Sequence, residues 1–367
     1  MLYRILKTLQ PFLLPVSLIV VVAAMLLAMD PTNKPLSATA PRRVAIVQHA
    51  SQGALDDGVT GILRALAARG FVDGKTIQVQ KFNAQGEMAT ANDIARRVTD
   101  GSFDLVITSS TASLQTVANV NRQHHVPHVF GIVAKASAAG VGVSPTNPLD
   151  HPPYMAGMES FISVHRLLQV ARKMHPGLKK LGLVWHSAEA NSEAYTLAAR
   201  KACAEFGIEL LEATADTSSA VGEAAASLTS RGAEAFIVTG DVLVLVAVDS
   251  VIKAGKQAGI PTFTVTPGNI RKGTIFDLGA DFITVGMEVG DLAADVLGGR
   301  ALQSVPVVNR VPERLTLNLV ALKKYPKWHV TPELLAEAKV IIDANGEHND
   351  DATRGNDAKL ATAPAQR

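Results

Sequence analysis

The chain has 367 residues, of which 47% are hydrophobic and 19% charged, and its formal net charge is +2. This length allows two compact lobes, and the composition is typical of a globular protein rather than a disordered one. Lysine and arginine do not cluster along the sequence, which argues against a nucleic-acid-binding protein. The single cysteine, Cys203, excludes an intramolecular disulfide, and its Ala-rich surroundings indicate a buried, inert thiol.

The N-terminal residues indicate where the protein is located. Residues 11–29 form an uncharged apolar run that Arg4 and Lys7 precede. Such a run can span a hydrocarbon core of about 30 Å, and the basic residues favour a cytoplasmic N-terminus. Pro41 follows Ala38-Thr-Ala40, the best candidate cleavage site, and should obstruct a signal peptidase. We therefore expect an uncleaved transmembrane helix that anchors an extracytoplasmic or periplasmic protein to the inner membrane, with a cleaved signal peptide as the alternative.

After a short linker rich in Pro, Ser and Thr, expected strands and helices alternate along the chain. Short apolar runs predict strands, and apolar residues at helical spacing predict helices. The strands expected in the first half are 44–47, 76–81, 105–107 and 129–133, and the helices are 55–66, 88–98 and 112–120. A Pro-dense stretch at 144–153 interrupts this series, and we interpret it as a crossover between lobes.

A second alternating series begins at residue 164. The expected helices are 164–174, 192–206, 219–230 and 243–258, and the strands are 181–185, 209–212, 235–238 and 262–265. Strand 274–278 and helix 282–297 are expected to return to the first lobe, 315–320 to form a last strand, and Thr331-Pro332-Glu333 to begin a final helix. The repetition predicts an α/β fold with two Rossmann-like lobes, whose parallel sheets are joined by a hinge.

The expected organisation is an N-terminal segment, two lobes and a tail. Residues 1–41 hold the anchor or signal and the linker. The first lobe comprises 42–140 plus 266–300, the second comprises 141–265 plus 301–343, and crossovers are expected near 133–154, 261–269 and 309–315. Residues 344–367 lack apolar periodicity, which predicts a disordered tail.

Several sequence features resemble catalytic or metal-binding motifs but lack the required context. The glycine-rich stretch at 70–76 has too few residues between its glycines for a phosphate loop, and it joins a helix to a strand. His124, His125 and His128 have no Asp, Glu or Cys beside them, which favours solvated or locally bonded histidines over a metal site. Neither a dinucleotide-binding fingerprint nor a serine-hydrolase elbow is present. We therefore expect no enzyme activity, no metal and no cofactor.

Hydrogen-bonding side chains follow expected strands in the first lobe. In open α/β sheets, ligands bind beyond the carboxyl ends of the strands. Ser110 and Thr111 follow the third strand and open a helix, so their hydroxyls and the helix amides could hold a carboxylate. Helix capping explains either residue equally well.

Polar and acidic side chains also follow strands in the second lobe. The strand that ends at Trp185 is followed by Glu189, Asn191 and Ser192, and the strand at 235–238 is followed by Asp241. The last three of these residues can be helix caps, whereas capping does not explain Glu189. An acid can bind an ammonium group, and the Trp185 indole can stack on a ring. Together the loops predict a protein that binds a zwitterionic or carboxylate-bearing small molecule.

Residues 44–343 resemble the ABC-transporter substrate-binding protein family that includes tryptophan- and tyrosine-binding members. The resemblance rests on Ala-Gln-Gly at 84–86, Asp-Leu-Val-Ile from 104 leading to Ser-Ser-Thr, the Ala-Ala-Gly turn at 138–140 and, most specifically, Ser-Ala-Glu-Ala-Asn-Ser at 187–192 before Gly-Asp at 240–241. It implies a type I periplasmic-binding fold that closes on an amino acid or similar solute. It also implies an ABC permease and an ATPase as partners.

Positions that match the family indicate which residues bind the ligand. The resemblance implies that the first lobe holds a ligand carboxylate, that the second lobe contributes its loop residues, and that Thr266 lies near the return hinge. The candidate ligand-binding residues are Ser51, Ser110, Thr111, Trp185, Glu189, Asn191, Ser192, Asp241 and Thr266. The chain departs from the family at 134–137, at 151–157 and at Val242, and Lys135 replaces the family's acid. These departures concern the identity of the ligand more than the fold.

We therefore expect an extracytoplasmic solute-binding protein of an ABC importer that binds its ligand by hinge closure. The alternative is a membrane-anchored, ligand-sensing ectodomain that is not coupled to import. A regulator of the lac-repressor type would need a helix-turn-helix where this chain has an apolar run.

Overall fold

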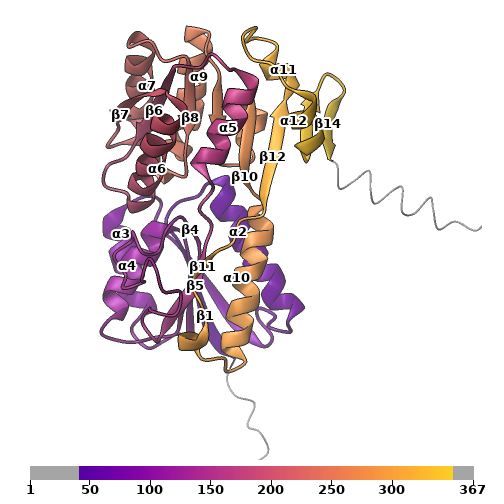
Figure 1. The fold of residues 1–367 in the computed structure, drawn as a ribbon. Helices are drawn as coiled ribbons and strands as arrows, with labels where there is room; N and C mark the ends of the chain where they lie inside the picture. Colours follow the sequence, from indigo (N-terminus) through magenta and orange to yellow (C-terminus); the bar gives the residue numbers. More distant parts are fainter. Residues whose placement is uncertain (1–40, 350–367) are drawn as a thin grey trace, which may run out of the picture. The chain divides into compact units, whose positions relative to one another are not determined.

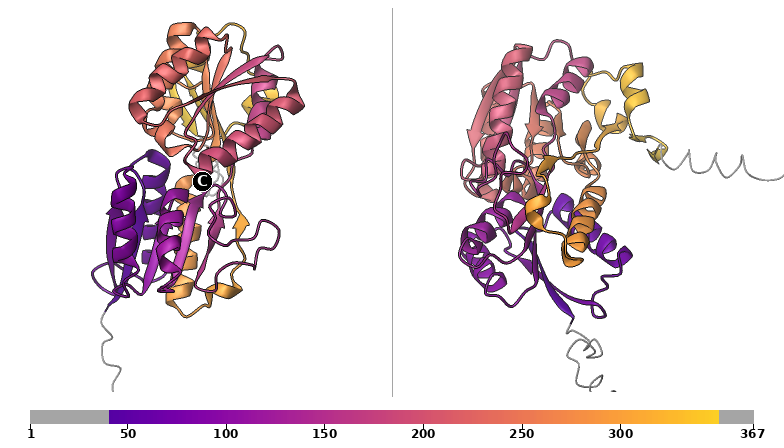
Figure 2. Two further views of the ribbon diagram at one scale, coloured as in Figure 1. Left: turned by 90° about the vertical axis from the view of Figure 1, so that its left-hand side faces the viewer. Right: turned by 60° about the horizontal axis from the view of Figure 1, so that its bottom comes forward.

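The computed structural model describes residues 41–349, which form two sheets with helices on both faces of each (Figures 1 and 2). The expected anchor or signal at 1–40 and the last part of the expected tail, 350–367, lie outside the described residues. Between residues 41 and 349, we find no helix with the length and apolar character needed to cross a membrane.

The first sheet has six strands in the order β11-β5-β4-β3-β1-β2. The pairs β1–β3, β3–β4, β4–β5 and β5–β11 are all parallel. The strands are β1 (Arg42–Gln48), β2 (Ile77–Asn83), β3 (Leu105–Ser109), β4 (His128–Val133), β5 (Met155–Glu159) and β11 (Val308–Asn309). The helices that cover this sheet are α2 (Gly53–Ala68), α3 (Met88–Val98), α4 (Thr111–Asn121) and α10 (Phe282–Leu297).

Both faces of this sheet are buried, which explains why its strands are apolar at successive positions. Val44 of β1 packs with residues of α2 and α10, whereas its neighbour Ala45 packs with α3 and α4. Helices α2 and α10 can approach closely because position 286 is glycine. A Cβ atom there would lie 2.1 Å from the carbonyl oxygen of Gly58. This contact seats α10, a late element of the chain, on the first sheet.

The second sheet has eight strands in the order β14-β13-β12-β10-β9-β8-β6-β7. It is parallel from β7 to β10, β12 runs antiparallel to β10, β13 is parallel to β12, and β14 is antiparallel to β13. The strands are β6 (Lys180–Trp185), β7 (Glu209–Thr214), β8 (Ala235–Val238), β9 (Thr262–Thr264), β10 (Phe276–Ala280), β12 (Glu313–Asn318), β13 (Val340–Asp343) and β14 (Gly346–Asn349).

Helices also cover both faces of the second sheet. Leu181 of β6 packs with α5 and α6, whereas Val184 of the same strand packs with α7 and α9. The helices and 3-10 turns in this half are α5 (Val164–Met174), α6 (Ala190–Phe206), η2 (Ser218–Ala220), α7 (Val221–Ser230), α8 (Val242–Val246), α9 (Val248–Ala258), η3 (Asn269–Lys272), α11 (Leu319–Leu322) and α12 (Pro332–Glu337). The 3-10 turn η4 (Leu302–Ser304) packs on the first sheet instead, with Leu302 in its core. The predicted α/β architecture is confirmed, and the sheets are mainly parallel, although the second also contains the antiparallel pairs β10–β12 and β13–β14. The helix expected over 243–258 is in fact two helices, α8 and α9, which meet at Ala247.

The chain passes between the two sheets three times, after β5, after β10 and after β11. We call each sheet with its covering helices a lobe. The third crossover lies within the expected range of 309–315, but the other two differ from the expected division. β5 pairs with β4 in the first lobe, not the second, and β10 pairs with β9 and β12 in the second lobe, not the first. The short β11 also belongs to the first lobe, although 301–343 was expected in the second.

The beginning of the expected tail is ordered as a hairpin. β14 pairs with β13 from Val340 opposite Asn349 to Asp343 opposite Gly346, so the prediction of disorder from residue 344 is wrong for 346–349. The polar sequence of 346–349 gave no signal for a strand, because all four residues of β14 are exposed on an edge strand. A strand of this kind needs no apolar alternation.

Candidate functional site

The loops that follow the strands of both lobes surround a small cavity, which we call the inner cavity. Its volume is about 50 Å³. It is lined by Gln52, Ala54, Leu55, Ser110, Thr111, Ile132, Ala134, Ser160, Asn191, Tyr195, Gly240, Val242, Leu245, Thr266 and Phe282. These residues come from both lobes, and none of them is Asp, Glu, Lys or Arg. The inner cavity therefore offers hydrogen bonds and apolar contacts, but no formal charge.

Ser110 and Thr111 line the inner cavity where α4 begins. Ser110 caps this helix, because its Oγ accepts a hydrogen bond from the Ser113 backbone N–H at 3.1 Å. The Ser110 backbone has φ 149° and ψ 161°, a region that is essentially restricted to glycine. The Thr111 Oγ1 accepts a hydrogen bond from the Ala134 N–H at 3.2 Å, which ties α4 to the end of β4.

Ile132 is a second residue of the inner cavity with an unusual backbone. Its φ is 55°, which is rare for a β-branched residue, and it lies where the pairing of β4 with β5 is interrupted. The side chain fits there only because position 58 is glycine, since a Cβ atom on Gly58 would lie 1.7 Å from the Ile132 Cδ1. Two neighbouring strand ends of the first lobe are therefore strained at the cavity wall, a feature that is common at functional sites.

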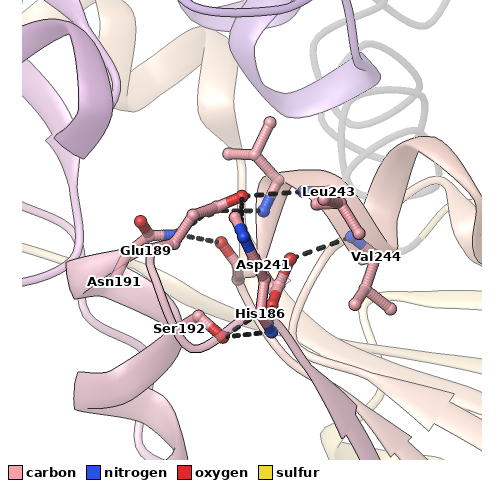
Figure 3. Close-up of polar contacts among 9 residues, drawn as sticks. His186, Glu189, Asn191, Ser192, Asp241, Leu243 and Val244 are labelled. Atoms are coloured by element: carbon pink, nitrogen blue, oxygen red, sulfur yellow. Dashed lines mark hydrogen bonds and ion pairs between the residues drawn. The ribbon is translucent and has the colours of Figure 1, made fainter. Parts of the chain in front are cut away.

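Asp241 joins the two strand-end loops of the second lobe (Figure 3). Its Oδ2 accepts hydrogen bonds from the His186 N–H at 2.7 Å and from the Ser192 hydroxyl at 2.6 Å. Its Oδ1 accepts from the Val244 N–H at 2.8 Å and caps α8. Burial raises the pKa of this carboxyl to about 6. Asp241 is fully buried and lines neither the inner cavity nor the chamber described below, so the structure gives no access for the expected ammonium contact.

Glu189 lies beside Asp241 and is bound mainly by its own lobe (Figure 3). Its carboxylate accepts hydrogen bonds from the backbone N–H groups of Val242 and Leu243, each at 3.1 Å. The Asn191 Nδ2 donates to it at 3.1 Å, and the His186 Nδ1 lies 3.5 Å away. Burial alone would raise the pKa of Glu189, but these hydrogen bonds outweigh burial and lower it, so the carboxylate is ionised at neutral pH.

Asn191 and Ser192 have different positions although they are adjacent. The Asn191 Nδ2 also donates to the Gly240 carbonyl at 2.8 Å, which holds the side chain at the wall of the inner cavity. Ser192 is fully buried behind the wall, where its Oγ accepts from the His186 N–H at 3.1 Å. Thr266, from the loop after β9, also lines the inner cavity.

Two residues expected in the site lie elsewhere. The Trp185 indole lines neither the inner cavity nor the chamber, and the Arg200 guanidinium lies over its ring, 5.6 Å from the centroid. Trp185 ends β6 and packs against the core of the second lobe, so stacking on a ligand is not supported. Ser51 is exposed and outside the cavity, and its Oγ accepts a hydrogen bond from the Asn83 Nδ2 at 2.9 Å.

Sequence reasoning missed several residues of the inner cavity. Gln52 caps α2, and this position after β1 could have been found as a strand-end residue. Ser160 was missed together with β5, the strand that it follows. Tyr195 lies inside α6, its hydroxyl accepts a hydrogen bond from the Ile162 N–H at 3.1 Å, and its ring stacks on Phe161 with centroids 4.3 Å apart. A tyrosine within a helix gives no sequence signal for such a role.

A larger compartment, which we call the outer chamber, adjoins the inner cavity. Its volume is about 620 Å³, and Asn191 and Val242 line both spaces. The polar residues of its wall are His49, Gln85, Glu87, Gln115, His186, Glu189, Asn191, Asp216, Thr217 and Ser218. These residues come from strand-end loops of both lobes and from α4. The outer chamber is therefore the charged part of the cleft.

The histidine cluster near residue 125 is separate from the cleft. His128 is fully buried, its Nε2 lies 2.9 Å from the Thr108 Oγ1, and burial lowers its pKa to about 3. The His125 ring stacks on Tyr154 with centroids 4.5 Å apart. Across the described part of the chain, no group of three or more His, Cys, Asp or Glu side chains is arranged to hold a metal ion.

Comparison with known sequences gives two results. A family model for ABC transporter substrate binding proteins matches residues 43–341. The tyrosine-binding protein of Clostridioides difficile (strain R20291) is 26% identical over 291 residues, which cover 79% of this chain and 83% of that protein.

Three solved structures have the same fold. A conserved domain protein from Vibrio cholerae is 25% identical with a TM-score of 0.77, covering 82% of this chain and 99% of its own. An ABC domain from Streptococcus pneumonia in complex with L-Trp is 17% identical with a TM-score of 0.77, and the coverage is 82% and 100%. The ligand-free, open structure of a substrate binding protein with adhesive properties from Clostridium difficile is 26% identical with a TM-score of 0.60, and the coverage is 80% and 97%.

Proposed function

The chain belongs to the family of ABC transporter substrate-binding proteins, and we propose that it binds a small amino-acid-like or carboxylate-bearing ligand between its lobes by hinge closure. Family membership confirms the expected resemblance and the expectation that the protein binds a solute and is not an enzyme. It also implies an extracytoplasmic location. The observation that carries the proposal is the inner cavity, which strand-end loops of both lobes line with uncharged polar groups.

The residues of the inner cavity suit the two ends of such a ligand. Ser110 and Thr111 lie at the N-terminus of α4, where helix amides favour a carboxylate. Asn191 and Thr266 provide hydrogen bonds from the second lobe. Glu189 contributes its negative charge from the outer chamber, whereas Ser192 and Asp241 act indirectly by holding the loops together.

Hinge closure is supported by the size of the inner cavity and by the rim of the outer chamber. About 50 Å³ admits little more than a few water molecules, so an amino acid can enter only if the lobes move apart. Met88 of the first lobe and Val246 of the second both line the outer chamber and are 53% and 50% exposed. Two large apolar side chains on opposite rims can be covered when the lobes close.

The comparison structures agree with a mobile cleft. The chains from Vibrio cholerae and Clostridium difficile are almost equally similar in sequence, at 25% and 26%, yet their TM-scores are 0.77 and 0.60. The lower value belongs to the structure described as ligand-free and open. This difference is expected if the lobes of the present chain lie closer together than in that open form.

The relatives direct the choice of ligands to test. One relative is named a tyrosine-binding protein, and one structural neighbour contains L-Trp. Tyr195 and Phe282, but not Trp185, provide aromatic surface in the wall of the inner cavity. Aromatic L-amino acids are therefore the first ligands to test.

The test is equilibrium dialysis of the detergent-extracted full chain against amino acids, simple carboxylates, sugars and nucleosides. We expect saturable binding of L-tyrosine or L-tryptophan. A hydrogen bond to a charged group contributes about 1.5–3 kcal/mol, so Thr111→Val should weaken binding by at least about tenfold. His125→Ala, distant from the cleft, is the control and should have no effect. Binding of sugars or nucleosides alone would contradict the proposal.

We further propose that residues 11–29 remain attached as an inner-membrane anchor and that the protein delivers its ligand to an ABC permease and its ATPase. The basis is the length of the apolar run and Pro41 beside the best cleavage site. Intact-mass measurement on membrane-extracted protein should give a chain that begins at Met1. A mature N-terminus near Met29 or Thr39 would show that the segment is a cleaved signal.

A further inference from the structure

The outer chamber has a strongly acidic wall. Glu87 contributes a carboxylate from the first lobe, and Glu189 and Asp216 contribute carboxylates from the second. None of the lining residues is a lysine or an arginine. His186 can carry one compensating positive charge, because its hydrogen bond with Glu189 raises its pKa. Even then, carboxylates outnumber cations in the wall.

Two of these carboxylates are free to bind a ligand. Glu87 precedes α3 but makes no capping hydrogen bond, and Asp216 lies in the loop between β7 and η2. Both side chains belong to exposed residues, and neither has a hydrogen bond or ion pair within 41–349. Because they lie on opposite lobes, closing the cleft brings like charges together in a space that is losing water. Such juxtaposition is unfavourable unless a positive charge lies between them.

His49 provides an independent sign of a ligand. It follows β1, lines the outer chamber and is only 6% exposed. Its Nδ1 is buried and has no hydrogen-bond partner among the described residues. Burial lowers the pKa of this imidazole, against the opposing effect of Glu189 and Glu87, so the ring is neutral at pH 7. A neutral imidazole has one nitrogen that can accept a hydrogen bond, and a buried unpaired nitrogen is costly.

We propose that the outer chamber receives a cationic, hydrogen-bond-donating group of the ligand, such as an ammonium, between Glu87 and His49 of the first lobe and Asp216 and Glu189 of the second. The apolar part of the same ligand then lies in the inner cavity. This inference rests on the proposed function and adds the charge that the ligand must carry. The cation removes the repulsion across the cleft, so it favours the closed state as well as contributing its own contacts.

The test compares matched probes that differ only in charged groups. L-Tyrosine, tyramine and 3-(4-hydroxyphenyl)propionate form one set, and L-leucine, 3-methylbutylamine and 4-methylpentanoate form the second. In each set we expect the amino acid to bind the full chain at least tenfold more tightly than its deaminated analogue, with detectable binding of the amine. Affinity for the amine-bearing probes should fall with ionic strength, because the chamber is partly open to solvent.

The double substitution Glu87→Gln with Asp216→Asn removes the two free charges without changing side-chain size. It should reduce the preference for amine-bearing probes at least fivefold and should flatten their salt dependence. His49→Leu should weaken the amine-bearing probes more than the deaminated ones. Glu223→Gln, an exposed residue in the first turn of α7, is the matched control and should change neither ratio.

The outcomes separate this inference from the proposed function. Equal binding of amino acid and deaminated analogue, or an unchanged preference in the double variant, would overturn the inference. Binding of 4-methylpentanoate or another carboxylate, without binding of any amine-bearing probe, would also overturn the inference. The proposed function would then stand for a carboxylate ligand. If none of the six probes binds and the dialysis panel also gives no ligand, both proposals are wrong.

Discussion

The side chain of Asn309 forms hydrogen bonds with both the backbone carbonyl and the backbone N–H of Phe161. The Asn309 Nδ2 donates to the Phe161 carbonyl at 3.0 Å, and the Phe161 N–H donates to the Asn309 Oδ1 at 2.8 Å. Phe161 lies on the crossover after β5, and Asn309 ends β11 just before the third crossover. Phe161 also stacks on Tyr195 of the inner cavity. Two of the three connections between the lobes are therefore fastened together, next to the cavity wall.

Asn309→Ala should loosen this fastening. Each hydrogen bond contributes about 0.5–1.5 kcal/mol, and Asn309 is exposed, so we expect a modest fall in the free energy of unfolding. The amide of Phe161 should exchange with solvent about three- to tenfold faster in hydrogen-exchange mass spectrometry. Asn147→Ala removes one loop hydrogen bond in the first lobe, to the Leu149 N–H, and is the control. Unchanged exchange at Phe161 would show that the crossovers are held by other contacts.

Asp241 and Thr266 should differ in how their substitution affects ligand binding. Asp241→Ala leaves the Ser192 hydroxyl and the Val244 N–H without their acceptor and removes one of the two acceptors of the His186 N–H. Each unsatisfied buried group costs about 1–3 kcal/mol, so the variant should lose about 3 kcal/mol or more of stability together with ligand affinity. Thr266→Val keeps the shape of the side chain and should weaken binding with little change in stability. Urea unfolding and equilibrium dialysis on both variants measure this. If Asp241→Ala kept full stability but lost ligand affinity, Asp241 would contact the ligand directly.

Local sequence patterns predicted most of the elements, because the periodicity of apolar residues lies within each element. The ranges expected for β8 and α10 agree with the structure. β5 was missed because it follows a Pro-dense stretch and contains Gly157, a weak strand former. Glycine is required there, since a Cβ atom would lie 2.1 Å from the Phe130 carbonyl oxygen. The first two crossovers were misplaced because their positions depend on which strands pair, and local sequence patterns do not show this.

The location of the site was also predictable, but the direction of its side chains was not. Strand-end loops were expected to meet, and Ser110, Thr111, Asn191 and Thr266 do line one cavity. A carboxylate after a strand can point to a ligand or back to helix amides, and the sequence does not distinguish these cases. Asp241 points back into its own lobe. Residues such as Tyr195 reach the cavity only because the lobes are placed together.

Ser110→Gly should stabilise the protein while weakening ligand binding. The backbone conformation of Ser110 costs about 1–3 kcal/mol for a residue with a Cβ atom. Replacing a serine cap by glycine costs only a few tenths of a kcal/mol, so we expect a net gain of about 1 kcal/mol in the free energy of unfolding. Loss of the hydroxyl from the cavity wall should reduce affinity. The matched control is Ser163→Gly, because Ser163 caps α5 at an ordinary φ of −68°. This substitution relieves no strain, so it should destabilise the protein. Equal destabilisation by both substitutions would exclude strain at Ser110.

Asp277 should make stability depend on pH. This residue of β10 is fully buried, the Thr274 hydroxyl donates to its Oδ1 at 2.6 Å, and its Oδ2 has no partner in the described residues. Burial raises its pKa to about 8, whereas an unfolded aspartate has a pKa of about 3.9. Folding therefore takes up a proton, so the contribution of Asp277 is fully present below about pH 4 and is lost as the pH rises toward about 8.

Asp277→Asn should remove this dependence, because the amide cannot ionise. One proton corresponds to about 1.4 kcal/mol per pH unit. Relative to the wild-type protein, the variant should therefore gain about 2 kcal/mol or more in the free energy of unfolding between pH 5 and pH 8. Urea unfolding at several pH values in this range measures the difference. Glu223→Gln, which removes an exposed carboxylate, should give a curve parallel to the wild type. If the curve for Asp277→Asn were also parallel to the wild type, the buried carboxyl would already be ionised in the folded protein across this pH range. A positive charge would then have to stabilise it, because the hydrogen bond from Thr274 supplies none.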